Sequence, residues 1–169
     1  MSAIHEHVLQ NGMTLLCWPQ RHLHGLEFGL YLKGGPLYET EETQGISNLL
    51  EHLCFRGLGG LNREGLLREL NRFGTNLDAA TYAEGLVFRL KCLPRFFDAA
   101  LEYFLRFFAN VPWTPEQIAA KKQVVLRQLE ADGDGDLFDR AACDFRRTEN
   151  AAFPPMGTPE SLLSLTAAD

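Results

Sequence analysis

The chain has 169 residues, of which 46% are hydrophobic and 22% charged, a composition typical of one globular domain with ample apolar material for a core. Sixteen Lys and Arg residues against 22 Asp and Glu residues leave a net charge of −6, so binding to nucleic acid through a surplus of positive charge is not expected. The N-terminal residues lack the pattern of a signal peptide, and no stretch approaches the roughly 18 apolar residues that a membrane span needs. These observations predict a cytoplasmic protein without a membrane partner.

The first part of the chain predicts three strands. Residues 5–19 contain two short apolar runs separated by Asn11-Gly12, a pair that accepts the positive φ angles of a hairpin turn. Residues 26–32 alternate between apolar and other side chains, and the glycines and proline of 33–36 end this run. We therefore expect a β-hairpin, then a third strand that leads into a turn.

Two short helices and an extended segment follow. Apolar residues recur at helical spacing over 45–56, and again over 63–73, where Gly74 provides a helix stop. Residues 77–93 are rich in β-branched and aromatic side chains. They predict either a pair of strands or one long bent strand interrupted near Glu84-Gly85.

The C-terminal half is predicted to be mainly helical. Pro94 suits a first helical turn, and the aromatic and leucine residues that recur up to Phe108 predict a helix buried on more than one side. Thr114-Pro115-Glu116-Gln117 predicts a capped start for a helix that reaches Asp132. The Asp-Gly run 132–136 is interpreted as a solvated loop, since an EF-hand would place a glutamate where Cys143 stands. A further helix around 140–146 and a final capped turn are expected after it.

The cysteines give no metal or disulfide pattern. Cys17, Cys54, Cys92 and Cys143 lie far apart, with no CxxC pair among them. Such a distribution is typical of free thiols that are mostly buried in the core.

One segment of the first predicted helix carries residues typical of metal chemistry. Asn48-Leu49-Leu50-Glu51-His52 matches the inverted zinc-binding pattern HxxEH except at its first position, where Asn48 replaces a histidine. Two imidazoles four residues apart lie on one face of a helix, and the glutamate before the second acts on zinc-bound water. A Glu-His pair is common on helix surfaces, so this segment by itself does not indicate a metal site.

The surrounding sequence resembles the pitrilysin/insulinase family of zinc metallopeptidases, which includes the mitochondrial processing peptidases, and it does so along nearly the whole chain. The similar segments are, in chain order, 9–13, 34–39, 45–57, 69–70, 74–81, 124–129, 157–162 and 165–166. Asp78 stands where the family usually has asparagine. Several separate motifs in the family's order make a specific resemblance to the N-terminal domain of such a peptidase.

The resemblance also shows where this chain departs from an active peptidase. It implies that an active member holds zinc with both histidines of HxxEH and a glutamate farther along the chain. Here His52 is the only retained ligand, while Asn48 and Gln128 stand at the other two ligand positions. Amide oxygens are neutral and suit hard ions better than zinc, so we expect no zinc cofactor here, although active relatives use one.

Three further residues near the motif were considered. Lys121 stands where such helices often carry an acidic residue, which places a cation at the edge of the site. Glu130 is not expected to replace Gln128 as a ligand, because two residues along a helix turn the side chain by about 200°. Glu51 keeps the position of the general base, but without metal-bound water it is expected to be idle, in solvent or in a salt bridge.

The resemblance implies an α+β fold, with an antiparallel-rich mixed sheet and helices packed on one face, as in a metallopeptidase half-domain of the LuxS/processing-peptidase type. It also implies two such halves, fused or separate, that close around an extended peptide and have the catalytic machinery in only one of them. We therefore expect residues 1–169 to form a single N-terminal peptidase-like domain that is truncated relative to the family. The second half is absent from this chain, and a second family subunit with an intact HxxEH is the expected partner.

The leading hypothesis for function is a noncatalytic partner or regulatory half that helps to bind an extended peptide or protein substrate for an active zinc peptidase. Asp78, Ala79, Ala80 and Thr81 resemble the strand that lies beside substrate in active halves, and they are candidate backbone contacts. An equal alternative is that these residues only build the sheet. Two other functions stay open, namely an active zinc metalloendopeptidase with atypical ligands and a stand-alone peptide-binding protein.

Overall fold

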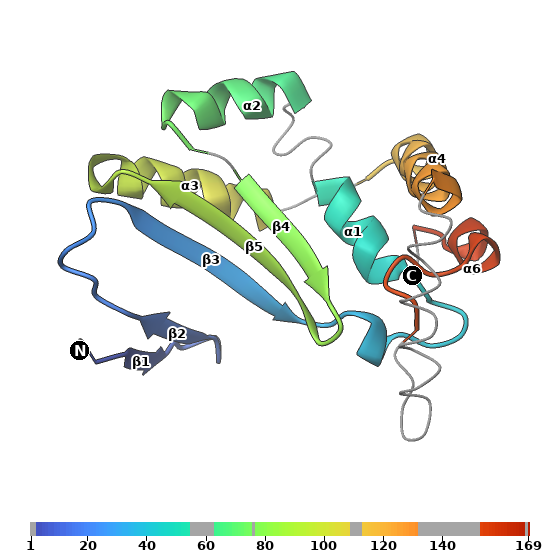
Figure 1. Cartoon of the computed structure of the whole chain (residues 1–169), viewed down its shortest axis with the longest axis horizontal. Helices are drawn as coiled ribbons and strands as arrows, with labels where there is room; N and C mark the ends of the chain where they lie inside the picture. Colours follow the sequence, from blue (N-terminus) through green and yellow to red (C-terminus); the bar gives the residue numbers. More distant parts are fainter. Residues whose placement is uncertain (1–2, 55–62, 76, 109–112, 132–152, 168) are drawn as a thin grey trace.

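The computed structural model describes residues 3–54, 63–75, 77–108, 113–131, 153–167 and 169. Its elements are β1 (His5–Val8), β2 (Thr14–Cys17), β3 (Leu26–Lys33), η1 (Pro36–Tyr38), α1 (Ile46–Cys54), α2 (Arg63–Arg72), β4 (Leu77–Tyr82), β5 (Gly85–Cys92), η2 (Pro94–Phe96), α3 (Phe97–Phe108), α4 (Pro115–Ala131) and α6 (Pro159–Ser164), shown in Figure 1. The elements predicted within these ranges are confirmed. The Asp-Gly loop at 132–136, the helix predicted around 140–146 and Cys143 lie outside the residues that the structure describes.

The main sheet has the strand order β3-β5-β4, and both of its strand pairs are antiparallel. Segment 77–93 is therefore a hairpin, the first of the two predicted alternatives, and it turns between Tyr82 and Gly85. Its second strand, β5, pairs with β3 from Leu26↔Cys92 to Lys33↔Gly85. All strand pairs in the described ranges are antiparallel, as expected for the antiparallel-rich α+β class.

Helix α3 covers one face of this sheet (Figure 1). Alternate residues of β5, including Phe88, Leu90 and Cys92, are buried on that face because side chains along a strand point to opposite sides. The Phe104 ring contacts Phe28 at 5.2 Å and Phe108 at 5.1 Å between ring centroids, with edge-to-face geometry. The aromatic stripe of the predicted helix is thus core. The predicted burial on more than one side is wrong, because Leu105 is 56% exposed and α3 buries only the face toward the sheet.

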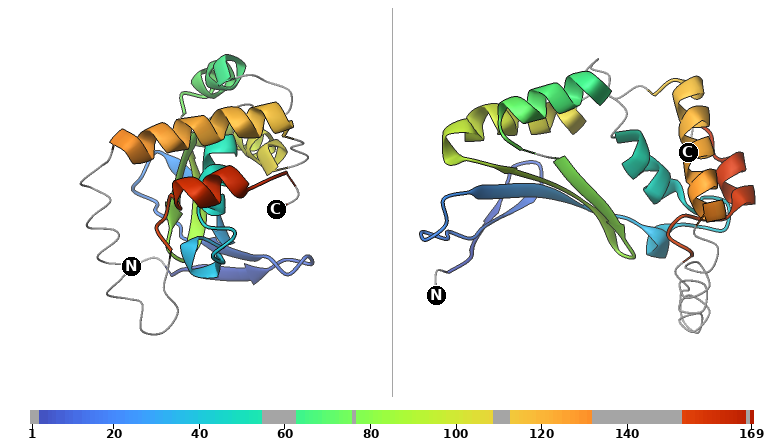
Figure 2. Two further views of the ribbon diagram at one scale, coloured as in Figure 1. Left: turned by 90° about the vertical axis from the view of Figure 1, so that its right-hand side faces the viewer. Right: turned by 45° about the horizontal axis from the view of Figure 1, so that its top comes forward.

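A second core cluster joins three helices. Leu49 and Leu53 of α1 pack with Ile118 and Val125 of α4 and with Leu162 of α6. Helix α1 lies between β4 on one side and α4 with α6 on the other, which Figures 1 and 2 both show. This position places the motif helix against both the sheet and the helical layer.

Polar contacts fix the ends of the two outer helices. The predicted cap of α4 is present, because Thr114 N–H donates to Gln117 Oε1 at 2.9 Å and Gln117 N–H donates to Thr114 Oγ1 at 3.3 Å. The Nζ of Lys122 donates hydrogen bonds to the carbonyl oxygens of Leu163 and Leu165, at the C-terminal end of α6. Burial lowers the pKa of Lys122, while the Asp169 carboxylate raises it. The ammonium therefore holds α6 to α4 through carbonyls that the helix itself leaves unpaired.

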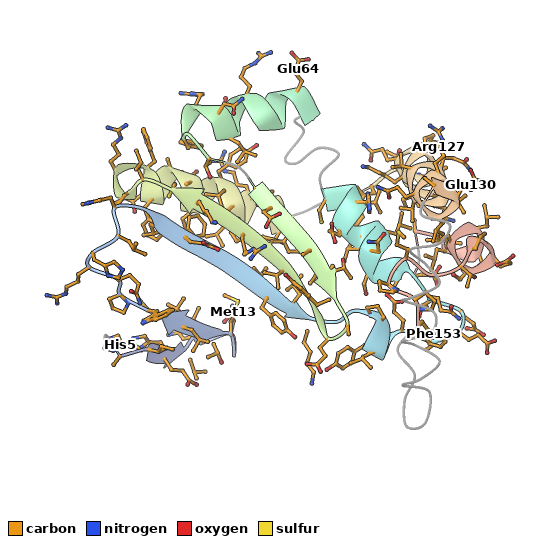
Figure 3. The ribbon with its side chains drawn as sticks, in the orientation of Figure 1. His5, Met13, Glu64, Arg127, Glu130 and Phe153 are labelled. Atoms are coloured by element: carbon orange, nitrogen blue, oxygen red, sulfur yellow. The ribbon has the colours of Figure 1, made fainter. Side chains whose placement is uncertain are left out.

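Strands β1 and β2 form a separate two-stranded sheet beside β3 (Figure 1). Its turn contains Asn11, whose side chain accepts a hydrogen bond from Met13 N–H at 3.1 Å, and Gly12 with φ of 82°. The hairpin expected in 5–19 is thus confirmed. Both of its strands are exposed, and His5 and Met13 are labelled on it in Figure 3.

The described cysteines are free thiols, as predicted. Cys54 and Cys92 are buried, whereas Cys17 on β2 is exposed. None of the helices in the described ranges has the length and apolar character needed to cross a membrane.

Candidate functional site at α1, β4 and α4

The N-terminus of α1 is held by an acidic side chain from the preceding loop. The Glu39 carboxylate accepts hydrogen bonds from Gly45 N–H at 2.8 Å and Ser47 N–H at 2.9 Å. The first N–H groups of a helix lack partners within it, and an anion there also meets the positive end of the helix dipole. The Ser47 hydroxyl in turn accepts from Gly35 N–H at 3.1 Å, so the loop and the helix start form one unit.

The other side of this loop lies tightly against the segment before α6. A Cβ on Gly45, whose φ is +84°, would lie 2.6 Å from the carbonyl oxygen of Met156. Gly157 has φ of +72°, and a Cβ there would lie 2.6 Å from the carbonyl oxygen of Gln44. Both positions therefore require glycine, for the backbone angle and for the close approach. Together they fix the start of α1 against the C-terminal segment.

Glu51 connects α1 to strand β4. The Thr81 hydroxyl donates a hydrogen bond to Glu51 Oε2 at 2.5 Å, and both side chains are half-buried. This contact corrects the prediction of solvent or a salt bridge around Glu51, because its partner is a hydroxyl on a strand thirty residues away. The carboxylate at the general-base position therefore has a structural partner on the candidate peptide-binding strand.

His52 and Lys121 bring the facing sides of α1 and α4 into electrostatic contact. Burial lowers the pKa of His52, the positive charge of Lys121 lowers it further, and the Glu51 carboxylate raises it. Lys121 follows Ile118 by three residues and precedes Val125 by four, and both of these pack against α1. The arrangement favours a neutral imidazole beside a fixed ammonium.

The two amides at the degenerate ligand positions differ in their surroundings. Asn48 lies one turn before His52, and its Oδ1 atom is buried without a hydrogen-bond partner among the described residues. Gln128 is exposed on α4, and so is Glu130, the rejected alternative, which is labelled in Figure 3. The structure thus brings Asn48, Glu51, His52 and Lys121 to neighbouring helix faces. Gln128 lies two turns after Lys121 on the same face of α4, with its side chain exposed.

The side chains at this site do not fit a zinc ion. Zinc sites in proteins use imidazole, thiolate and carboxylate ligands, and here one imidazole is accompanied by two amides and an ammonium. Burial, together with the Glu51 charge, raises the pKa of the nearby Cys54 to about 12, so its thiol is protonated and not a ready ligand. In the part of the chain that the structure describes, no three His, Cys, Asp or Glu side chains are grouped to hold a metal ion.

The four candidate substrate contacts occupy both faces of β4. Asp78 points away from α3 and forms an ion pair with Arg89 at 2.5 Å, whereas Ala79 packs against the core. Ala80 follows on the outward side and Thr81 on the side of α1. Within the described ranges β4 pairs only with β5, so its other edge, beside α1, carries backbone groups without a neighbouring strand.

Two contacts of the site are not predicted from the sequence. The Glu39 cap and the Glu51–Thr81 bond join residues six to thirty positions apart, and no periodic pattern marks such pairs. Glu39 lay inside a segment that resembled the family, which is the only signal that pointed to it. Thr81 had been singled out for its backbone and not for its hydroxyl.

The chain is similar to known proteins both in sequence and in structure. The family model described as Insulinase (Peptidase family M16) matches residues 24–154. The chain is 27% identical over 161 residues to an uncharacterised zinc protease of Rickettsia felis, covering 94% of this chain and 39% of that protein. It is 28% identical over 102 residues to the beta subunit of a mitochondrial-processing peptidase from Caenorhabditis elegans, covering 60% of this chain and 22% of the subunit.

A solved structure has the same fold. It is the inactive domain of an M16 peptidase from Pseudomonas fluorescens, which superposes with a TM-score of 0.85 at 17% identity and covers 98% of this chain and 41% of that one. This chain thus spans about two-fifths of the length of the Rickettsia protein and of the Pseudomonas domain. The family model covers well over half of the chain, and the α+β fold agrees with it. The chain therefore belongs to the insulinase family, peptidase family M16.

Proposed function

We propose that this chain is a noncatalytic half of an insulinase-family peptidase, which helps to bind an extended peptide for a partner subunit with an intact HxxEH motif. The proposal rests on one juxtaposition. Helix α1 lies beside an open edge of strand β4, but it carries Asn48 at a ligand position, and the charge of Lys121 acts on its His52. The fold of a peptidase half is thus present, while the charges that zinc chemistry needs are not.

The relatives support a divided protein. One of them is a subunit of a mitochondrial-processing peptidase, and a solved domain with this fold is an inactive one. Relatives are also named zinc proteases, so zinc belongs to active members of the family. For this chain we propose that residues 1–169 act as one domain, and that a partner chain holds the zinc.

Peptide binding would occur by strand addition to the open edge of β4. The backbone N–H and C=O groups of alternate residues on an edge strand are available to a peptide in extended conformation. The contacting backbone would be that of residues 78–81, with Thr81 held in place by Glu51. The net charge of −6 favours basic peptides, and their binding should weaken as salt increases.

Alternate N-methylation of the peptide tests this mode. A fluorescent basic peptide of about a dozen residues is titrated with the protein, and its anisotropy is measured at low ionic strength. Two further peptides of the same sequence carry N-methyl groups on alternate residues. One isomer is methylated at the odd-numbered residues, and the other at the even-numbered residues. Only one edge of an added strand pairs with β4, so we expect one isomer to lose binding at least about tenfold while the other binds like the parent. Equal binding of all three peptides, or equal loss by both isomers, would refute strand addition.

The remaining parts of the proposal concern location and other partners. We propose a cytoplasmic protein that contacts neither nucleic acid nor a membrane, which the acidic composition supports for nucleic acid. Fractionation of cells with an antibody to the chain tests the location. Recovery in a membrane or periplasmic fraction would overturn it.

A further inference from the structure

The packing of α4 against α1 brings the positive charge of Lys121 near the degenerate motif. Ile118 and Val125 of α4 are buried against Leu49 and Leu53 of α1, so the side of α4 that carries Lys121 faces the motif helix. Lys121 is half-buried. Its charge acts on His52, as does that of Glu51, so all three groups share one electrostatic environment.

We propose that Lys121 excludes divalent metal ions from this site, and that its ammonium supplies the positive charge beside Glu51 and His52 that a metal ion would otherwise supply. This role of Lys121 rests on the proposed noncatalytic function, because it explains why the degenerate motif holds no metal ion. Its test measures metal binding and not peptide binding, so each can fail while the other stands.

The charges at the site account for the exclusion. A divalent ion in a protein is usually balanced by carboxylate or thiolate ligands, and its own charge dominates the site. Here Asn48 is neutral, and the Glu51 carboxylate already accepts a hydrogen bond from Thr81. Adding two positive charges beside an existing ammonium would be repulsive, and partial burial weakens the screening by solvent.

Exclusion by Lys121 and loss of the ligands predict different zinc affinities once the ligands are restored. Replacing Asn48 by His and Gln128 by Glu restores the ligand types of HxxEH and its distal glutamate. If the missing ligands were the whole defect, this double variant would bind zinc fully. If Lys121 excludes the ion, the double variant binds poorly until the lysine is also replaced.

Four proteins separate these cases: the natural chain, N48H/Q128E, N48H/Q128E/K121Q and N48H/Q128E/R127Q. Arg127 is an exposed cation on the same helix, labelled in Figure 3, so R127Q removes one positive charge from α4 without touching the site. Zinc affinity is measured by calorimetry, cobalt binding by visible absorption, and folding by circular dichroism. We expect K121Q to raise zinc affinity at least about tenfold over the double variant, and R127Q to change it by less than about twofold.

Several results would overturn the inference. Equal affinity with and without K121Q would show that the lysine has no influence on metal binding, and an equal gain from R127Q would show a general charge effect. Failure of all the folded variants to bind, N48H/Q128E/K121Q included, would overturn it too, because removal of the lysine would not admit the ion. Stoichiometric zinc in the natural chain, lost in His52→Ala, would show that the ammonium does not exclude the ion. If one of these variants does not fold, Lys121→Gln and Arg127→Gln are made in the natural chain and their cobalt binding is compared. The inference then requires that Lys121→Gln raises cobalt binding and that Arg127→Gln does not.

Discussion

At the residue scale, the Glu51–Thr81 bond is the contact that ties the motif helix to the sheet. Replacing Thr81 by Val removes the hydroxyl but keeps the shape and the β-branched side chain, so the Glu51 carboxylate loses a donor while half-buried. We expect the free energy of unfolding to fall by about 1–2 kcal/mol, because hydrogen bonds to charged groups contribute more than neutral ones. Urea unfolding measures the change, and Thr81→Ser, which keeps the hydroxyl, is the control. Equal stability of the two variants would show that the bond contributes nothing.

The same residues show how far single positions can be predicted from sequence. Asn48, Glu51 and His52 are predictable because a five-residue motif is local and requires only helical spacing. Lys121 was noticed as a departure from the family. Its charge at His52, however, depends on how α1 and α4 pack, which the helix sequences alone do not determine. The Thr81 hydroxyl depends on packing in the same way.

At the element scale, helices and strands were predicted well where one periodicity dominates. The alternation in β3 predicts one buried face, and the structure has it. The stripe in α3 correctly predicts a helix, but only one side of that helix is buried. Segment 77–93 allows two interpretations because its pattern is interrupted near Glu84-Gly85, where the chain could either bend or turn back. The structure has the pair of strands: Tyr82 pairs with Gly85, and β4 and β5 run antiparallel from that turn. Such long-range pairing is a property of the sheet and not of a local pattern.

Helix α1 itself depends on a cap that lies outside it. Glu39→Gln keeps the side-chain shape but removes the charge that meets two N–H groups and the helix dipole. We expect a loss of about 1–2 kcal/mol in the free energy of unfolding. Glu42→Gln is the matched control, because Glu42 is an exposed acid in the same loop and its change should stay within about 0.5 kcal/mol. Equal losses in the two variants would mean that only net charge matters.

At the scale of the whole molecule, two core clusters share one side chain. Trp113 packs against both the sheet cluster under α3 and the cluster of α1, α4 and α6. It precedes α4, so the helical layer is anchored to the sheet near the start of that helix. The site therefore lies where these two layers meet, with β4 on one side of α1 and α4 on the other. Neither cluster could be assigned from sequence, because apolar periodicity shows which face is buried and not what covers it.

The β1–β2 hairpin leads to a prediction about association. Its apolar residues include Val8, Leu16 and Trp18, which are 70%, 64% and 63% exposed, and an apolar surface of this kind favours contact with another chain. We expect the isolated protein to self-associate, so its sedimentation coefficient should rise with concentration in the ultracentrifuge. Leu16→Lys with Trp18→Ser should reduce this rise, whereas Leu163→Lys, at a 60% exposed position on α6, should not. If the protein is a monomer at every concentration and has a high melting temperature, the apolar surface of the hairpin does not cause association.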